Sequence, residues 1–164
     1  MAITSLKDVY IDQMQDIYSA DTQSKDVMPE LAKAAKSDEL RQAIEKSIKG
    51  IESGMETLSK ILKGHDADPS DEFCKGMEGL VKEARAHGLD EKIEDGDARD
   101  AMIITQVQRM GHYAIAGYGC CAAFAERLGL EDEARMLREC LDGTRDGDKK
   151  MTEIAKSTVN PAAS

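Results

Sequence analysis

The sequence has no tryptophan, and its 164 residues include only two phenylalanines and three prolines. Alanine, glutamate, lysine, leucine and methionine, which favour helices, dominate the composition instead. We therefore predict an all-α protein. The length fits one domain over residues 1–164, with flexible ends expected at about residues 1–4 and 158–164.

The sequence also lacks a long apolar run and an excess of positive charge. No run approaches the roughly 20 residues that a membrane-spanning helix needs. The formal net charge of −10 argues against binding to nucleic acid or to an anionic membrane, because both require clustered lysine and arginine. The beginning, MAITSLKDVY, holds an acidic residue and no apolar core, so we expect no signal peptide and a cytoplasmic location.

The cysteines do not form a paired metal-binding or redox motif. Cys120 and Cys121 are adjacent, so on a helix their side chains point in different directions, and Cys74 and Cys140 stand alone. Without an export signal we expect all these thiols to be reduced. We interpret them as small packing residues, with a redox or zinc role as the alternative.

Apolar residues recur with a helical period along most of the chain, which predicts four long helices and one short helix. The short helix lies in the connection between two pairs of long helices, an arrangement typical of a four-helix bundle. In chain order, the predicted helices cover residues 5–36, 37–63, 72–86 (the short one), 98–128 and 131–157.

Glycines and prolines mark where these helices should end. Gly64 and Gly129 follow the second and the fourth predicted helices, and Pro161 follows the last. Pro29 lies inside the first predicted helix, where it should kink the helix or break it in two.

Glycines also occur inside the predicted helices, where each costs about 1 kcal/mol relative to alanine. Some are spaced four residues apart and therefore share a helix face. Either they let helices approach closely, or they leave an interior void that a ligand could fill. The glycines are Gly50, Gly54, Gly111, Gly117, Gly119, Gly143 and Gly147. The void would be lined by Met14, Ile17, Ser24, Ser47, Val107 and Cys140.

Several motifs resemble the YciF-type ferritin-like family. They are YSADTQ (18–23), CKGMEGLVKEA (74–84), RDAMIITQVQRMGHYAIAGYG (99–119) and LRECLDGTRDGDKKMTEIA (137–155). The most specific piece is HYxIAxYG, and the similarity covers nearly the whole chain. The resemblance implies a ferritin-like four-helix bundle with one extra helix, in a bacterial, stress-associated and dimeric protein.

Members of this family usually carry carboxylates that bind two metal ions inside the bundle, and this chain departs from that pattern. Where the family has a glutamate after YSA, this chain has Asp21. In the second helix, Ser47 replaces a histidine, Gly50 a glutamate and Gly54 a glutamine. By this resemblance, Asp21 is the only carboxylate left at these inward positions of the first two helices.

The last two long helices depart from the family pattern in the same way. The family's EHYEIA reads GHYAIA here, with Gly111 and Ala114 in place of both glutamates. The family's EEEK reads DGTR at residues 142–145, so that Gly143 stands inside this motif. Acidic residues persist on the outer surface, and the loss is therefore concentrated at inward positions.

A di-iron or di-manganese centre needs about four to six oxygen or nitrogen ligands that face one point. Glycine and alanine supply no such ligand, and one aspartate cannot hold two cations. We therefore expect no cofactor, with residual iron or manganese binding as the alternative. A further, enzymatic interpretation is a mononuclear metal or hydrolytic site on Asp21, His112, Asp142 and Asp146.

The remaining polar side chains near these positions have structural interpretations. His112, the only histidine inside a long predicted helix, either hydrogen-bonds a buried backbone or tyrosine partner or acts as a ligand or base. Asp21 is expected to pair with His112, Tyr113 or Arg145 unless it contacts a metal. Core residues with one hydroxyl bond each are expected at Tyr18, Tyr113 and Tyr118.

The sequence thus favours a non-enzymatic role over catalysis. The protein is interpreted either as a structural or interaction module, dimeric through an apolar helix face, or as a module that binds a small molecule where the family binds metal. The former metal-site or cavity-lining positions are Asp21, Ser47, Gly50, Gly54, Gly111, His112, Ala114, Gly143 and Gly147.

Overall fold

The computed structural model describes residues 2–164, which form four long helices and several short helical segments. The long helices are α1 (Leu6–Ala34), α2 (Asp38–Gly64), α4 (Gly96–Arg127) and α5 (Glu131–Ile154). The short α3 (Lys75–Glu83) continues into a π-helical turn, Ala84–Gly88. A second π-helical turn, Ala155–Val159, follows α5 and leads into α6 (Asn160–Ala162).

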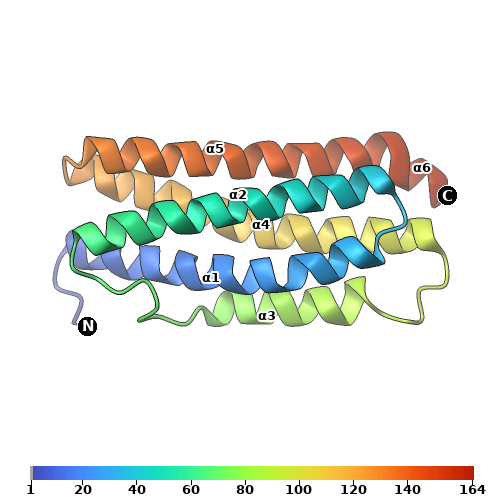
Figure 1. The fold of residues 1–164 in the computed structure, drawn as a ribbon, viewed down its shortest axis with the longest axis horizontal. Coiled ribbons are helices and arrows are strands. Elements are labelled where there is room, and N and C mark those ends of the chain that lie inside the picture. The colour runs from blue at the N-terminus through green and yellow to red at the C-terminus, as the bar shows by residue number, and fades with distance from the viewer. Residues whose placement is uncertain (1) are drawn as a thin grey trace.

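The four long helices form a bundle in which each helix packs against two others. α1 packs on α2 and α4, and α5 packs on the same two helices, so that α1 and α5 lie at opposite corners. α3 lies outside the bundle against α1 and α4, on the side away from α5 (Figure 1). The predicted all-α four-helix bundle with one extra short helix is therefore confirmed.

Capping side chains explain where the helices begin. Ser5, Ser37, Cys74 and Asp95 each accept a hydrogen bond from a backbone N–H in the first turn of the helix that follows. Such caps satisfy donors that have no partner within the helix. Gly129 has a φ of +73°, a left-handed conformation that favours glycine, and it terminates α4 as predicted.

Two predicted helix ends differ from the structure. α1 continues through Pro29 to Ala34, so of the two predicted outcomes, a kink or a break, the break is wrong. Pro29 lies on the exposed face, where water can reach the carbonyl group that loses its partner, and the neighbouring Met28 is buried in the core. The last helical stretch does not end before Pro161, because Pro161 lies in the first turn of α6 and Val159 is buried.

None of the helices in residues 2–164 is long and apolar enough to cross a membrane. Their buried apolar residues instead form two clusters, one toward each end of the bundle. One contains Val27, Leu31 and Ile44, and the other contains Met14 and Leu58. The bundle core is therefore interrupted near its middle.

The interruption follows from the residues of α2 and α5. No residue of α5 between Leu141 and Met151 is buried. On α2, Gly54 is the only buried residue between Ile44 and Leu58. Side chains that would close the middle of the bundle are thus missing from both helices.

Gly117 has a clear packing role where α4 crosses α1. A Cβ atom at this position would lie 2.6 Å from Ile17 Cγ1 and 2.8 Å from Ile17 Cδ1. Ile17 is only 1% exposed, so it has little room to move aside. Glycine therefore permits the close contact of α1 with α4 at this point, as one of the two interpretations predicted.

We expect alanine substitutions at two glycines of α4 to have opposite effects. Gly117→Ala should lower the free energy of unfolding by roughly 1–3 kcal/mol, because the methyl group overpacks the contact with Ile17. Gly111→Ala is the matched control, because a Cβ there meets nothing within 4 Å. It should raise stability by up to about 1 kcal/mol through helix propensity. Urea unfolding of both variants measures the difference, and equal effects would contradict the assignment.

Candidate functional site: a cavity between α2 and α5

The interruption of the core opens a cavity of about 740 Å³ between α2 and α5, with residues of α1 and α4 also in its lining. Its lining includes every former metal-site position that the sequence analysis named, with the exception of His112. These positions are Asp21, Ser47, Gly50, Gly54, Gly111, Ala114, Gly143 and Gly147.

The glycines of the cavity differ in what surrounds them. A Cβ atom at Gly50, Gly111 or Gly143 would meet nothing within 4 Å, so these residues border open space. At Gly54 a Cβ would collide with the Tyr118 hydroxyl. Close packing therefore explains Gly54. Gly50 and Gly143 are exposed, so the open space beside them lies at the mouth of the cavity. Gly111 is partly buried, and it alone of the three fits the alternative interpretation, an interior void.

The cavity wall is only partly as the sequence suggested. Ser24, Ser47, Val107 and Cys140 line it, but Met14 and Ile17 do not. The wall also includes apolar residues that the sequence analysis did not assign to it. They lie on the inward faces of their helices, at Met28, Ile51, Met110, Met136 and Met151.

Asp21 is the buried carboxyl group of the cavity. Asp21 is 3% exposed, and Tyr118 Oη donates a hydrogen bond of 2.6 Å to Asp21 Oδ2. Burial raises the pKa of Asp21 to about 7, although the bond from Tyr118 acts in the opposite direction. The carboxyl group therefore changes charge near neutral pH.

The second carboxyl oxygen, Asp21 Oδ1, receives no hydrogen bond from residues 2–164. Within the same residues, no buried side-chain oxygen or nitrogen atom lacks a partner. Oδ1 is therefore not sealed in the protein, and because Asp21 lines the cavity we infer that Oδ1 is reached from there.

The expected partners of Asp21 all lie elsewhere. His112 Nε2 is 3.1 Å from Asp148 Oδ1, and Arg145 Nη1 is 3.8 Å from Asp142 Oδ1. Tyr113 Oη donates to Asp16 Oδ2 at 2.9 Å. The prediction that Asp21 pairs with one of these residues is wrong, because Tyr118, five residues after Tyr113 on α4, meets Asp21 instead.

His112 lies on the surface of the bundle. Its side chain is 63% exposed, which contradicts the predicted buried partner. Met110 and Ala114, two residues to each side, are buried. Successive residues on a helix are about 100° apart. A residue two positions away from Met110 and from Ala114 therefore points outward.

The side chains present do not fit a metal centre. Within residues 2–164, no three His, Cys, Asp or Glu residues come together in a way that could hold an ion. Of the fallback set, Asp142 and Asp146 are exposed, His112 points outward, and Asp21 is bonded to Tyr118. Two hard cations require several carboxylates around one point, and the interior of this cavity supplies one.

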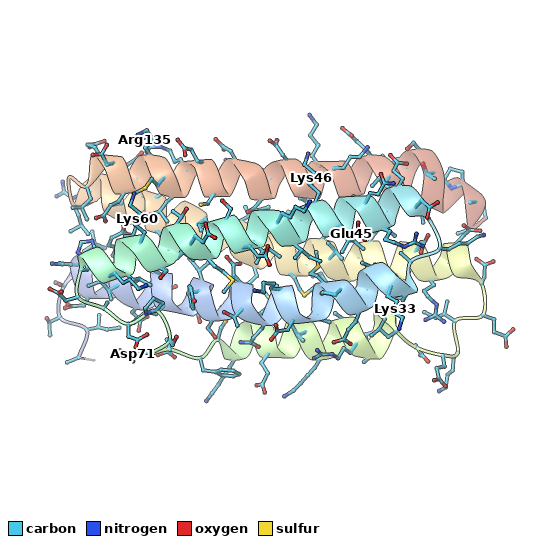
Figure 2. The ribbon with its side chains drawn as sticks, viewed as in Figure 1. Lys33, Glu45, Lys46, Lys60, Asp71 and Arg135 are labelled. Atoms are coloured by element: carbon cyan, nitrogen blue, oxygen red, sulfur yellow. The ribbon has the colours of Figure 1, made fainter. Side chains whose placement is uncertain are left out.

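Charged residues at the mouth of the cavity carry both signs. Lys46, Lys60 and Lys150 line it and are exposed, and Figure 2 shows the first two on α2. Exposed acids in the lining include Glu56 and Asp146. The lysines lie at the rim, so the buried part of the cavity holds no cationic side chain.

A second polar cluster, which sequence reasoning missed, attaches α3 to the bundle. Cys74 Sγ accepts from the backbone N–H of Met77 and donates to Tyr113 Oη at 3.0 Å. Tyr113 in turn donates to Asp16. Tyr113 therefore makes two hydroxyl bonds, not the one that was predicted. The only sequence signal was the position of Cys74 before a helical stretch.

The cysteines otherwise follow their helix faces. Cys74 and Cys121 are buried, which fits the packing interpretation, and Cys140 is partly buried. Cys120 is exposed, so the adjacent pair does point in different directions, but packing does not account for Cys120.

We expect Asp21 to make stability fall as pH rises toward neutrality. Between pH 3.8 and about 7 the folded state keeps a proton on Asp21 that the unfolded chain has lost. The free energy of unfolding therefore decreases with pH across this window. Asp21→Asn has no such proton, so its loss of stability between about pH 5 and about pH 8 should be smaller than that of the wild type.

Urea unfolding at both pH values tests this expectation. Asp142→Asn is the control, because Asp142 is an exposed acid of α5 and should leave the pH dependence unchanged. Parallel pH profiles for the wild type and Asp21→Asn would contradict the assignment of a protonated, buried carboxyl group.

Comparison with known proteins identifies the family. The family described as "Domain of unknown function (DUF892)" matches residues 5–164. Protein YciF of Escherichia coli K12 is 32% identical over 164 residues, which cover 99% of this chain and 98% of YciF. The crystal structure of the E. coli stress protein YciF superimposes with a TM-score of 0.89 at 31% identity, covering 96% of this chain and 99% of that one.

A second solved structure, YcfI from Rhodopseudomonas palustris, gives a TM-score of 0.85 at 29% identity, over 92% of this chain and 94% of that one. The resemblance to the YciF-type family is thus confirmed in sequence and in fold. This chain belongs to the DUF892 family.

Proposed function

We propose that this protein is a non-enzymatic, stress-associated member of its family that binds a small organic molecule in the cavity between α2 and α5. The single observation that supports the proposal is the cavity itself, which occupies the level of the bundle where the core is interrupted. A volume of about 740 Å³ lies within the range of small-molecule sites.

The stress association rests on the relative. The E. coli protein is described as a stress protein, and it matches this chain over nearly the full length of both. The side chains of the cavity support the non-enzymatic role, because they supply few metal ligands or catalytic groups. Asp21 is the one carboxyl group in the buried part of the cavity, and it accepts a hydrogen bond from Tyr118. The homodimer that the family resemblance implies stays a prediction, which light scattering of the purified protein checks.

Blocking the cavity should abolish ligand binding without loss of the fold. Gly143 lines the cavity and is exposed, so Gly143→Leu adds a bulky side chain at the cavity mouth. It should prevent the fluorescence increase that the neutral, apolar probe Nile red shows with the wild type. Gly79→Leu is the matched control, because Gly79 also borders open space but lies on α3, outside the cavity. This control variant should bind the probe like the wild type.

Two results would contradict the proposal. One is equal probe binding by the wild type and Gly143→Leu, which would place the bound probe outside the cavity. The other is near-stoichiometric iron or manganese in protein purified from metal-supplemented medium, measured by mass spectrometry of the metals. That second result would favour the alternative function, residual di-metal binding.

A further inference from the structure

Apart from Ser53, which is exposed, the hydroxyl groups that line the cavity have already used their hydrogen-bond donors. Ser47 Oγ on α2 donates to a carbonyl of its own helix at 3.0 Å, and Thr144 Oγ1 on α5 does the same at 2.9 Å. Tyr118 donates its proton to Asp21. Because a hydroxyl group has one proton and two lone pairs, these oxygens can only accept hydrogen bonds from a ligand.

The one side-chain amide of the lining, that of Gln108, has also used its hydrogen-bond donors. Gln108 Nε2 donates to Asp148 Oδ1 at 3.1 Å and to Thr152 Oγ1 at 2.8 Å, so both of its N–H groups are engaged. The polar part of the inner wall therefore presents acceptors, with Asp21 Oδ1 as the acceptor that carries charge.

The charge inside the cavity has one sign. Asp21 is its buried carboxyl group, whereas the lysines of the lining are exposed, and Lys150 is paired with Glu39 at 3.0 Å. Burial raises the pKa of the Cys140 thiol, which keeps this group neutral. Above about pH 7, where Asp21 is mostly ionised, a ligand that enters the cavity therefore meets one negative charge and no buried positive charge.

The remaining wall is apolar and adaptable. Methionine side chains, which fit irregular shapes, come from α1, α4 and α5, and branched aliphatic side chains come from α2 and α4. These wall residues are Met28, Met110, Met136, Met151, Ile51 and Val107. An apolar ligand body would gain burial along this wall.

Building on the proposed function, we propose that the ligand is an organic cation in which a primary ammonium group is carried on an apolar body. The ammonium group donates to Asp21 Oδ1, and the body lies along the methionine-lined wall. An ammonium group has three donors and no acceptor, which matches a wall that presents acceptors and one negative charge. A carboxylate ligand would instead face the charge of Asp21 without a buried cation to offset it.

Three probes of matched shape separate the possible ligand classes. They are 4-phenylbutylamine, 4-phenylbutan-1-ol and 4-phenylbutyrate, which share one apolar body and differ in the polar end. We expect titration calorimetry with the full-length wild type at about pH 8, where Asp21 is mostly ionised, to show the amine binding about tenfold or more tightly than the alcohol. The carboxylate should bind most weakly.

Variants test whether Asp21 causes the preference for the amine over the alcohol and the carboxylate. Asp21→Asn should weaken binding of the amine by about tenfold or more and should leave binding of the alcohol within about twofold. Asp142→Asn removes an exposed acid of α5 that does not line the cavity, so it should leave binding of all three probes unchanged. Gly143→Leu should abolish binding of all three.

The outcomes distinguish this inference from the function on which it rests. Equal or tighter binding of the alcohol or the carboxylate, or an amine affinity that Asp21→Asn does not change, overturns the organic-cation assignment while the cavity remains a binding site. If none of the three probes binds to the wild type and Nile red does not bind either, the proposed function fails, and the inference fails with it.

Discussion

The interruption of the core between α2 and α5 is the constraint on which the rest of this structure depends. Two apolar clusters hold the ends of the bundle, but α2 and α5 contribute glycines where side chains would otherwise meet. A helix interior loses about 1 kcal/mol for each glycine relative to alanine. Only part of that cost is explained by packing, because Gly54 and Gly117 are required by close contacts whereas Gly50, Gly111 and Gly143 border open space.

Asp21 is the second costly feature at the same level of the bundle. A buried carboxyl group without a cationic partner destabilises the folded state when it ionises. Tyr118 offsets part of that cost through one hydrogen bond, and Gly54 leaves the space that the Tyr118 hydroxyl needs. Helices α1, α2 and α4 are thus coupled through a carboxyl group, a phenol and a missing side chain, an arrangement that keeps one acceptor open to the cavity.

The helices could be predicted from the sequence because their apolar period and their caps are local signals. The end of α1 and the last helical turns could not, since tertiary packing and water access decide whether a helix continues past Pro29 or Pro161. The positions lining the cavity were reached through family resemblance, whereas the contact of Asp21 with Tyr118 was missed. Which of the two tyrosines on α4 meets Asp21 depends on the relative shift of two helices, and periodicity does not determine that shift.

Anomalous X-ray diffraction at the iron and manganese absorption edges tests the central claim most directly, with crystals of protein produced in medium rich in both metals. The account predicts no anomalous peak at mid-bundle and, where density fills the space between α2 and α5, the continuous shape of an organic molecule beside Asp21. Two anomalous peaks held by side chains at that level would contradict it.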